Sequence, residues 1–170
     1  MSQFTHEVRN GIAWVAFDSG AMNTLSAAAV TDLNALRATL QRLHASTPLK
    51  GVILKGNRFG LGAGANIGEL MTASRVELGK FIDAGHEALY AIEEGPVPWL
   101  ALIDGVALGG IYELALGCRG IIATERSTIP GGPVAACVKA SVTAGGTADR
   151  RVQSSAARWA PLRPSPWDIE

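Results

Sequence analysis

The sequence has few of the residues that would point to a disulfide scaffold, a metal centre or a charged partner. Its two cysteines, Cys118 and Cys137, and its three histidines do not have the paired spacing of a metal site. So few cysteines argue against a disulfide scaffold and favour a reducing compartment. Lys+Arg and Asp+Glu number 15 each, so no excess charge favours nucleic acid or an anionic membrane as a partner.

Long hydrophobic runs are also missing. No apolar stretch reaches the about 20 residues of a membrane-spanning helix, and the polar residues 1–7 do not resemble a signal peptide. Apolar residues make up 48 % of the chain and charged residues 18 %, which is a globular composition. We therefore expect a cytoplasmic protein with no membrane or nucleic-acid partner and one ordinary core.

Strand and helix patterns alternate over residues 1–129. Apolar runs predict strands at 11–18, 51–54, 99–103 and 121–123, and those at 51–54 and 99–103 have the composition of strands covered on both faces. Helical spacing of apolar residues predicts a helix from Ser26, with Ser26 as a cap, and a second helix that carries Leu78 to Ile92. A third helix of small residues is predicted near Gly110. This alternation predicts an α/β fold.

The composition changes at residue 130. Five of the eight prolines lie in residues 130–170, and Ala, Gly, Ser and Pro together fill 21 of the 41 positions there. The apolar residues of this segment follow neither a helical nor a strand period. Such a segment buries too little apolar area to offset its ordering entropy. We predict a folded unit over residues 1–129 and a disordered or loosely packed tail over residues 130–170.

Two glycine-rich stretches, residues 62–70 and 104–115, each follow a predicted strand and lead toward a helix. Small residues allow a ligand to approach the backbone, and a helix start offers unpaired N–H groups. Two such starts, near Ala65 and Gly110, would form an oxyanion hole if they converged on one point.

The same stretches resemble a known family. Residues 63–70 read AGANIGEL and residues 96–118 read PVPWLALIDGVALGGIYELALGC. These resemble the patterns AGADIxEL and KPVIAAVxGxALGGGxELALACD of the crotonases, the enoyl-CoA hydratase/isomerase superfamily. Asn23-Thr24-Leu25-Ser26 resembles the family's first coenzyme A-contacting turn. The resemblance covers residues 8–129 and is greatest to the hydratase part of multifunctional fatty-acid oxidation proteins.

The resemblance implies an incomplete crotonase-like ββα spiral and a lyase or isomerase acting on acyl-CoA in fatty-acid and lipid metabolism. Ala65 and Gly110 match the oxyanion-hole donors, and Glu113 matches the first of two catalytic glutamates. No cofactor is implied, because coenzyme A is part of the substrate, and members form trimers or multifunctional complexes. The positions that match substrate-binding residues are Asn23, Leu25, Ala63, Gly64, Asn66, Ile67 and Gly109.

Departures from the family pattern predict impaired hydration. Pro133 stands where the second glutamate is expected, and proline cannot transfer a proton. Ile111 replaces the third glycine, which adds bulk beside the oxyanion site, and Asn66 replaces the usual aspartate. The family's C-terminal helices have no counterpart, which suggests truncation or a reading-frame shift near residue 130. The alternatives are a non-catalytic acyl-CoA binder or an unstable fragment.

A nicotinamide-dinucleotide enzyme is a further alternative. Gly60, Gly62 and Ala65 fit a loose G-x-G-x-x-A fingerprint, with Asp83 eighteen residues beyond Ala65. The simpler interpretations are that Glu113 is an ordinary residue near a helix start, that Cys118 belongs to the core and that His86 is solvated.

Overall fold

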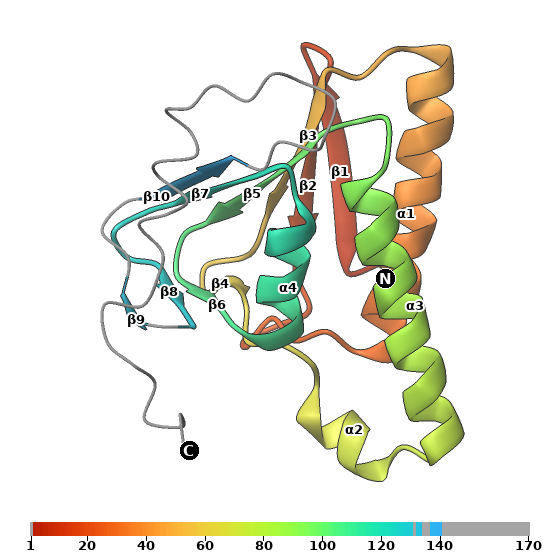
Figure 1. The fold of residues 1–170 in the computed structure, drawn as a ribbon, viewed down its shortest axis with the longest axis vertical. Helices are drawn as coiled ribbons and strands as arrows, with labels where there is room; N and C mark the ends of the chain where they lie inside the picture. The colour runs from red at the N-terminus through yellow and green to blue at the C-terminus, as the bar shows by residue number, and fades with distance from the viewer. Residues whose placement is uncertain (1, 131, 134–136, 141–170) are drawn as a thin grey trace, which may run out of the picture.

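The computed structural model describes residues 2–130, 132–133 and 137–140, and its strands form two sheets (Figure 1). The larger sheet has the strand order β1-β2-β3-β5-β7-β10, with antiparallel strands at both edges and parallel pairing in between. In that order its strands span Phe4–Arg9, Ile12–Phe17, Gly51–Lys55, Trp99–Ile103, Gly120–Ala123 and Cys137–Ala140.

The smaller sheet contains short strands in the order β4-β6-β8-β9, which span Gly60–Gly62, Val106–Ala107, Thr128–Ile129 and Gly132–Pro133. Strands β3, β5 and β7 of the larger sheet are followed along the chain by β4, β6 and β8 of the smaller one. A helix or helices then follow both β4 and β6. This repetition confirms the predicted α/β class and the ββα spiral.

The described helices are α1 (Ala27–Ser46), α2 (Ile67–Thr72), α3 (Arg75–Glu93) and α4 (Gly109–Gly117). The predicted cap of α1 is confirmed, because the Ser26 hydroxyl accepts a hydrogen bond from the Ala29 amide at 3.0 Å. A capping box of Ser74 and Glu77 begins α3. Helices α1 and α3 lie side by side (Figure 1). No helix in the described part of the chain is long and apolar enough to cross a membrane.

The larger sheet buries one face. Alternate residues of its parallel strands are buried, among them Val15, Leu54 and Ala101, which are aligned across neighbouring strands. On the opposite face Leu100 is 37 % exposed and Ile122 is 44 % exposed. The prediction that residues 51–54 and 99–103 are covered on both faces was therefore wrong, because the described residues provide a packed layer on only one side.

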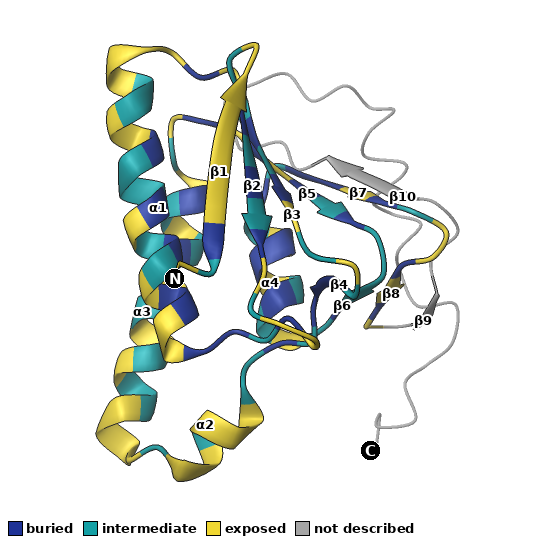
Figure 2. Cartoon of the chain, turned by 180° about the vertical axis from the view of Figure 1, so that it is seen from behind, coloured by how far each residue is buried: buried dark blue, intermediate teal, exposed yellow. Residues whose placement is uncertain are grey.

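A tight hairpin joins β1 to β2. Asn10 and Gly11 both have positive φ, 54° and 81°, as the central pair of a type I′ turn requires. The sequence analysis did not predict β1, and the structure gives the reason: only Phe4 of its six residues is buried, so the strand lacks a full apolar alternation (Figure 2). Phe4 stacks on Phe17 of β2 with ring centroids 4.5 Å apart.

An ion pair connects the end of β5 to the loop after β7. The Asp104 carboxylate accepts hydrogen bonds from Arg126 Nε at 3.1 Å and from the Thr124 hydroxyl at 2.7 Å. The hydrogen bond from Arg126 is the main cause that lowers the pKa of Asp104 below its ordinary value, and the bond from Thr124 lowers this pKa further. The contact therefore helps to position the turn at Gly105, from which the second glycine-rich stretch continues.

Two short strands, β9 and β10, lie in the described part of the segment that was predicted to be a tail. Strand β9 pairs with β8, and β10 pairs antiparallel with β7. The prediction of a disordered or loosely packed tail otherwise falls on residues 131, 134–136 and 141–170, which lie outside the described residues.

The Asn23 side chain is buried at the centre of the loop between β2 and α1. Its Nδ2 donates to the carbonyl oxygens of Phe17 at 3.1 Å and Leu61 at 2.9 Å, and its Oδ1 accepts from the Ser19 amide at 2.8 Å. Asn23 is 1 % exposed and has a φ of 49°, which asparagine tolerates better than most residues. One side chain thus links the end of β2 to β4.

We predict that Asn23→Ala lowers the free energy of unfolding by about 2–3 kcal/mol, because it leaves buried backbone groups without partners. Urea denaturation followed by circular dichroism measures the change. Thr31→Ala, at an exposed position of α1, serves as the control and should change stability by less than about 0.5 kcal/mol. Equal stability of Asn23→Ala and the unaltered protein would contradict the role given to this side chain.

Candidate active site

The first glycine-rich stretch is held against the segment before α1 by backbone hydrogen bonds. Leu25 and Ala65 form an isolated parallel bridge, in which the Leu25 amide donates to the Gly64 carbonyl at 2.8 Å. The Asn66 amide donates back to the Leu25 carbonyl at 2.7 Å. Ala65 therefore lies in this bridge, before Asn66, the N-cap of α2. A helix start therefore lies near Ala65 as predicted, although the bridge to Leu25 holds the Ala65 backbone.

The second glycine-rich stretch passes from β6 into α4 as predicted. Leu108 is the N-cap, and Gly109 begins the helix with a φ of 50°, a conformation that favours glycine. Gly110 is the second residue of α4, so its amide has no acceptor within the helix. Across the described residues, neither the Gly110 nor the Ala65 amide donates a backbone or side-chain hydrogen bond.

The two stretches touch through their backbones. Strands β4 and β6 pair in parallel, and the Leu108 amide donates to the Gly62 carbonyl at 3.0 Å. A Cβ atom added to Gly64 would lie 3.1 Å from the Leu108 carbonyl oxygen, and one added to Gly109 would lie 3.5 Å from the Gly64 Cα. A Cβ atom at Gly64 would therefore be crowded, whereas one at Gly109 would make an ordinary contact.

This contact places both candidate donors on one cavity. Ala65, Gly110, Leu25 and Glu113 all line a cavity of about 130 Å³ between the glycine-rich stretches and helices α1, α3 and α4. Most of the other lining residues are apolar, and they include Val30, Leu33, Phe81, Ile82, Leu89 and Leu114. An apolar chamber with two unpaired amides and one carboxylate suits a ligand that has a polarised carbonyl and a hydrocarbon chain.

Glu113 and His86 are the ionisable side chains of this cavity. Glu113 lies on α4, is exposed, and makes no hydrogen bond or ion pair with the described residues. His86, on α3, lines the same cavity and also shares with Glu113 a second, neighbouring cavity of about 240 Å³. His86 is exposed, which agrees with the interpretation of a solvated histidine. The sequence alone did not reveal that it lines a cavity with Glu113, because a single histidine on a helix does not show which neighbouring helix it meets.

The other predicted binding residues are placed differently. The Asn23 side chain points into the protein, so only its backbone could meet a ligand. Ala63 donates its amide to the Met22 carbonyl at 3.1 Å, and Asn66 caps α2 by accepting from the Glu69 amide at 3.3 Å. Ile67 is 69 % exposed at the start of α2, a helix without buried residues (Figure 2). These four residues do not line the cavity.

Ile111 does not crowd the candidate oxyanion site. It is fully buried, and its Cγ1 atom would lie 3.0 Å from a Cβ atom added to Gly62. The side chain therefore points into the core behind the glycine-rich stretches and is not among the residues that line the cavity. The expectation that Ile111 adds bulk beside the site was wrong, because its place on α4 turns it away from Gly110.

The dinucleotide alternative does not fit the geometry. A dinucleotide fingerprint requires its glycines in the turn between a strand and a helix, whereas Gly60 and Gly62 are the ends of strand β4. Among the described residues, no group of three or more His, Cys, Asp or Glu side chains could hold a metal ion.

Gly64→Ala should weaken the contact between the two stretches. The new Cβ would meet the Leu108 carbonyl, and the φ of 91° is unfavourable for alanine, so we predict destabilisation by about 1–3 kcal/mol. Gly79→Ala, on α3, is the matched control: its Cβ meets nothing within 4 Å, and alanine should stabilise the helix by about 1 kcal/mol. The melting temperatures of both variants test these predictions. A Gly64→Ala melting temperature equal to or above that of the unaltered protein would contradict the close contact.

Comparisons with known proteins agree with this architecture. The sequence model of the enoyl-CoA hydratase/isomerase family matches residues 7–157. An enoyl-CoA hydratase from Bacillus anthracis superposes with a TM-score of 0.69 at 23 % identity, over 75 % of this chain and 50 % of that one. The enoyl-CoA hydratase from Thermoplasma volcanium gives 0.70 at 19 % identity, over 76 % and 51 %. A putative enoyl-CoA hydratase from Streptomyces coelicolor gives 0.66 at 26 % identity, over 75 % and 47 %.

The chain thus spans about half the length of these solved structures. The family match covers most of the sequence, including both glycine-rich stretches and Glu113. Together with the repeated ββα units, this match shows that the chain belongs to the enoyl-CoA hydratase/isomerase family.

Proposed function

We propose that this chain binds acyl-CoA thioesters, with the amides of Ala65 and Gly110 as donors to the thioester oxygen. The observation that carries the proposal is that both amides lack partners among the described residues and line the same apolar cavity. Both residues are half-buried, and two unpaired amides on one small apolar cavity suit an oxygen acceptor as its occupant.

The cavity accounts for the rest of such a ligand. Its apolar walls suit the acyl chain. Ala63, Gly64, Asn66 and the exposed Ile67 lie outside the lining set, and we place the coenzyme A moiety there. Hydrogen bonds to the thioester oxygen would withdraw electrons from the conjugated system and make the β-carbon electrophilic. We therefore propose a role in fatty-acid β-oxidation, with a 2-enoyl-CoA as the substrate class.

Hydration of such a substrate requires two proton movements. Glu113 is positioned to orient a water molecule and to accept its proton when oxygen adds to the β-carbon. The α-carbon must then receive a proton from an acid, and Pro133 stands at the sequence position where the family pattern has the second glutamate. We therefore propose that hydration by this chain is slow.

The second candidate function is acyl-CoA binding without turnover. It is favoured by the same proline and by the Glu113 carboxylate, which no described residue holds in a fixed orientation. In this case the amides and the apolar walls would still bind the thioester, but no acid and base pair would act on it.

Gly110→Pro tests the oxyanion role. Proline removes the N–H and is tolerated in the first turn of a helix. We predict that it weakens acetoacetyl-CoA binding by about tenfold, since one hydrogen bond contributes about 0.5–1.5 kcal/mol, or about 1.5–3 kcal/mol if the acceptor is charged. Isothermal titration measures the affinity. Gly110→Ala keeps the N–H and adds only a Cβ, which would lie 3.8 Å from Leu25, so it should bind almost as the unaltered protein does. Equal affinities of the two variants would contradict the role of this amide.

Pro133→Glu tests the account of slow hydration. Restoring a carboxylate should raise crotonyl-CoA hydration by about 100-fold or more, the usual contribution of a positioned acid or base, and Glu113→Gln should remove that gain. Pro130→Glu, at a neighbouring exposed proline, is the control and should have no effect. Rapid hydration by the unaltered protein would refute the impairment, whereas tight binding without turnover in Pro133→Glu would favour the non-catalytic binder.

A further inference from the structure

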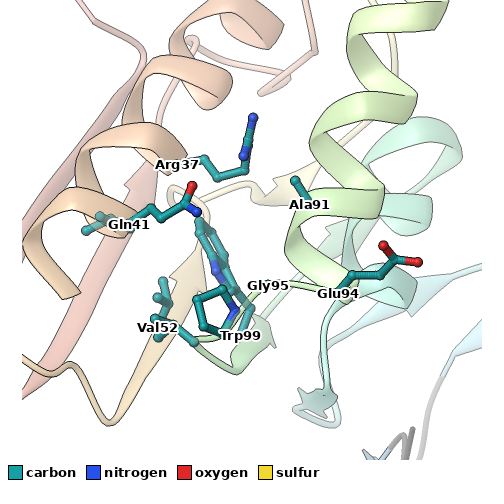
Figure 3. Close-up of a pocket in the computed structure, with 10 residues that line it drawn as sticks. Arg37, Gln41, Val52, Ala91, Glu94, Gly95 and Trp99 are labelled. Atoms are coloured by element: carbon teal, nitrogen blue, oxygen red, sulfur yellow. The ribbon is translucent and has the colours of Figure 1, made fainter. Parts of the chain in front are cut away.

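A third cavity, of about 230 Å³, lies between α1, the carboxyl end of α3 and the strands β3 and β5 (Figure 3). Its lining includes Arg37 and Gln41 from α1, Val52 from β3 and Trp99 from β5. None of its lining residues belongs to the candidate active site. It is therefore a separate site within the layer between the helices and the larger sheet.

Trp99 brings an unpaired donor to this cavity. Trp99 as a whole residue is 4 % exposed, and its indole N–H makes no hydrogen bond with the described residues. The buried donor without a partner at this cavity is Arg37 Nε, not the indole nitrogen. Because an indole only donates, a ligand that meets the Trp99 ring edge must offer it an acceptor.

Arg37 adds unused donors at the same place. Its one ion pair in the described structure joins Nη2 to Glu87 Oε1 at a long 3.4 Å, and its buried Nε has no partner. Gln41 lines the cavity as well, and its amide makes no hydrogen bond with the described residues. Indole, guanidinium and amide groups thus offer several donors around one space, of which only Arg37 carries a positive charge.

The negative charges near the cavity do not saturate these donors. Glu87 is 69 % exposed at its long contact with Arg37. Glu94 is the one carboxylate among the lining residues, and its oxygen atoms point away from Trp99 (Figure 3). The remaining walls are largely apolar, formed by Leu40, Val52, Ala91, Pro96 and Val97. An occupant that suits both kinds of wall has an acceptor-rich anionic head and a short hydrocarbon body.

We propose that this cavity binds a short-chain carboxylate, with its oxygens on the Arg37 guanidinium and the Trp99 indole and its alkyl chain against Leu40 and Val52. The volume is below the about 300–1,000 Å³ of cofactor and drug sites, which favours a small ligand. Inorganic phosphate would satisfy the donors but would leave the apolar walls unfilled. The site does not depend on the proposed acyl-CoA function.

Titration of the full chain with butyrate tests the site, with indole N–H groups observed by NMR after ¹⁵N-tryptophan labelling and chloride used to hold ionic strength constant. Trp99→Phe assigns the Trp99 resonance among the four tryptophans. We expect this resonance to shift saturably with butyrate. Arg37→Gln should weaken the affinity by about tenfold or more, as loss of a hydrogen bond to a charged group implies.

Arg42→Gln, on the same helix but outside the lining residues, is the matched control and should bind butyrate as the unaltered protein does. Methyl butyrate, which lacks the charge, and inorganic phosphate, which lacks the alkyl chain, should produce no saturable shift at the same concentrations. A spectrum of the folded protein that does not respond to butyrate would overturn the proposal and indicate a cavity filled with water. Unchanged affinity in Arg37→Gln, or tighter binding of phosphate than of butyrate, would overturn it as well.

Discussion

Close backbone contact between two glycine-rich stretches is the constraint on which the candidate active site depends. Gly64 and Gly109 approach so closely that a side chain on Gly64 would meet the Leu108 carbonyl, and the pairing of β4 with β6 holds this arrangement. The contact orders two loops that would otherwise be independent. Within the described part of the chain, the amides of Ala65 and Gly110 are left without hydrogen-bond partners, and both residues line one cavity. This arrangement suits a carbonyl oxygen.

A second constraint is the one-sided packing of the larger sheet. The long described helices form one layer against the buried face of the sheet. Both cavities to which we attribute ligands are lined by residues of this helical layer. The opposite face keeps a half-exposed apolar row that includes Leu100 and Ile122. The candidate ligand sites therefore arise where helices meet strands, because only there do apolar walls and unpaired donors enclose a common space.

Local sequence patterns predicted most of the elements but not how each is covered. The regular stripe from Val30 to Leu40 and the cap at Ser26 predicted α1 correctly, since both are local properties. Strand β1 was missed because only Phe4 is buried, and the two-residue and three-residue strands of the smaller sheet carry too few residues for a period. The prediction that the strand containing Leu100 is buried on both faces was wrong, because a continuous apolar run does not reveal whether a second layer packs on it.

The sequence by itself determined the order of the two glycine-rich stretches, the place of Glu113 after Gly110 and the resemblance to the family, because these depend on residue identity and spacing along the chain. Only the tertiary structure decided that Asn23 is a buried support, that Ile111 turns into the core and that His86 shares a cavity with Glu113. It alone placed Arg37 beside Trp99, which are far apart in the chain. The physical reason is that burial and unpaired donors are set by contacts between distant segments, and a linear pattern carries no record of those contacts.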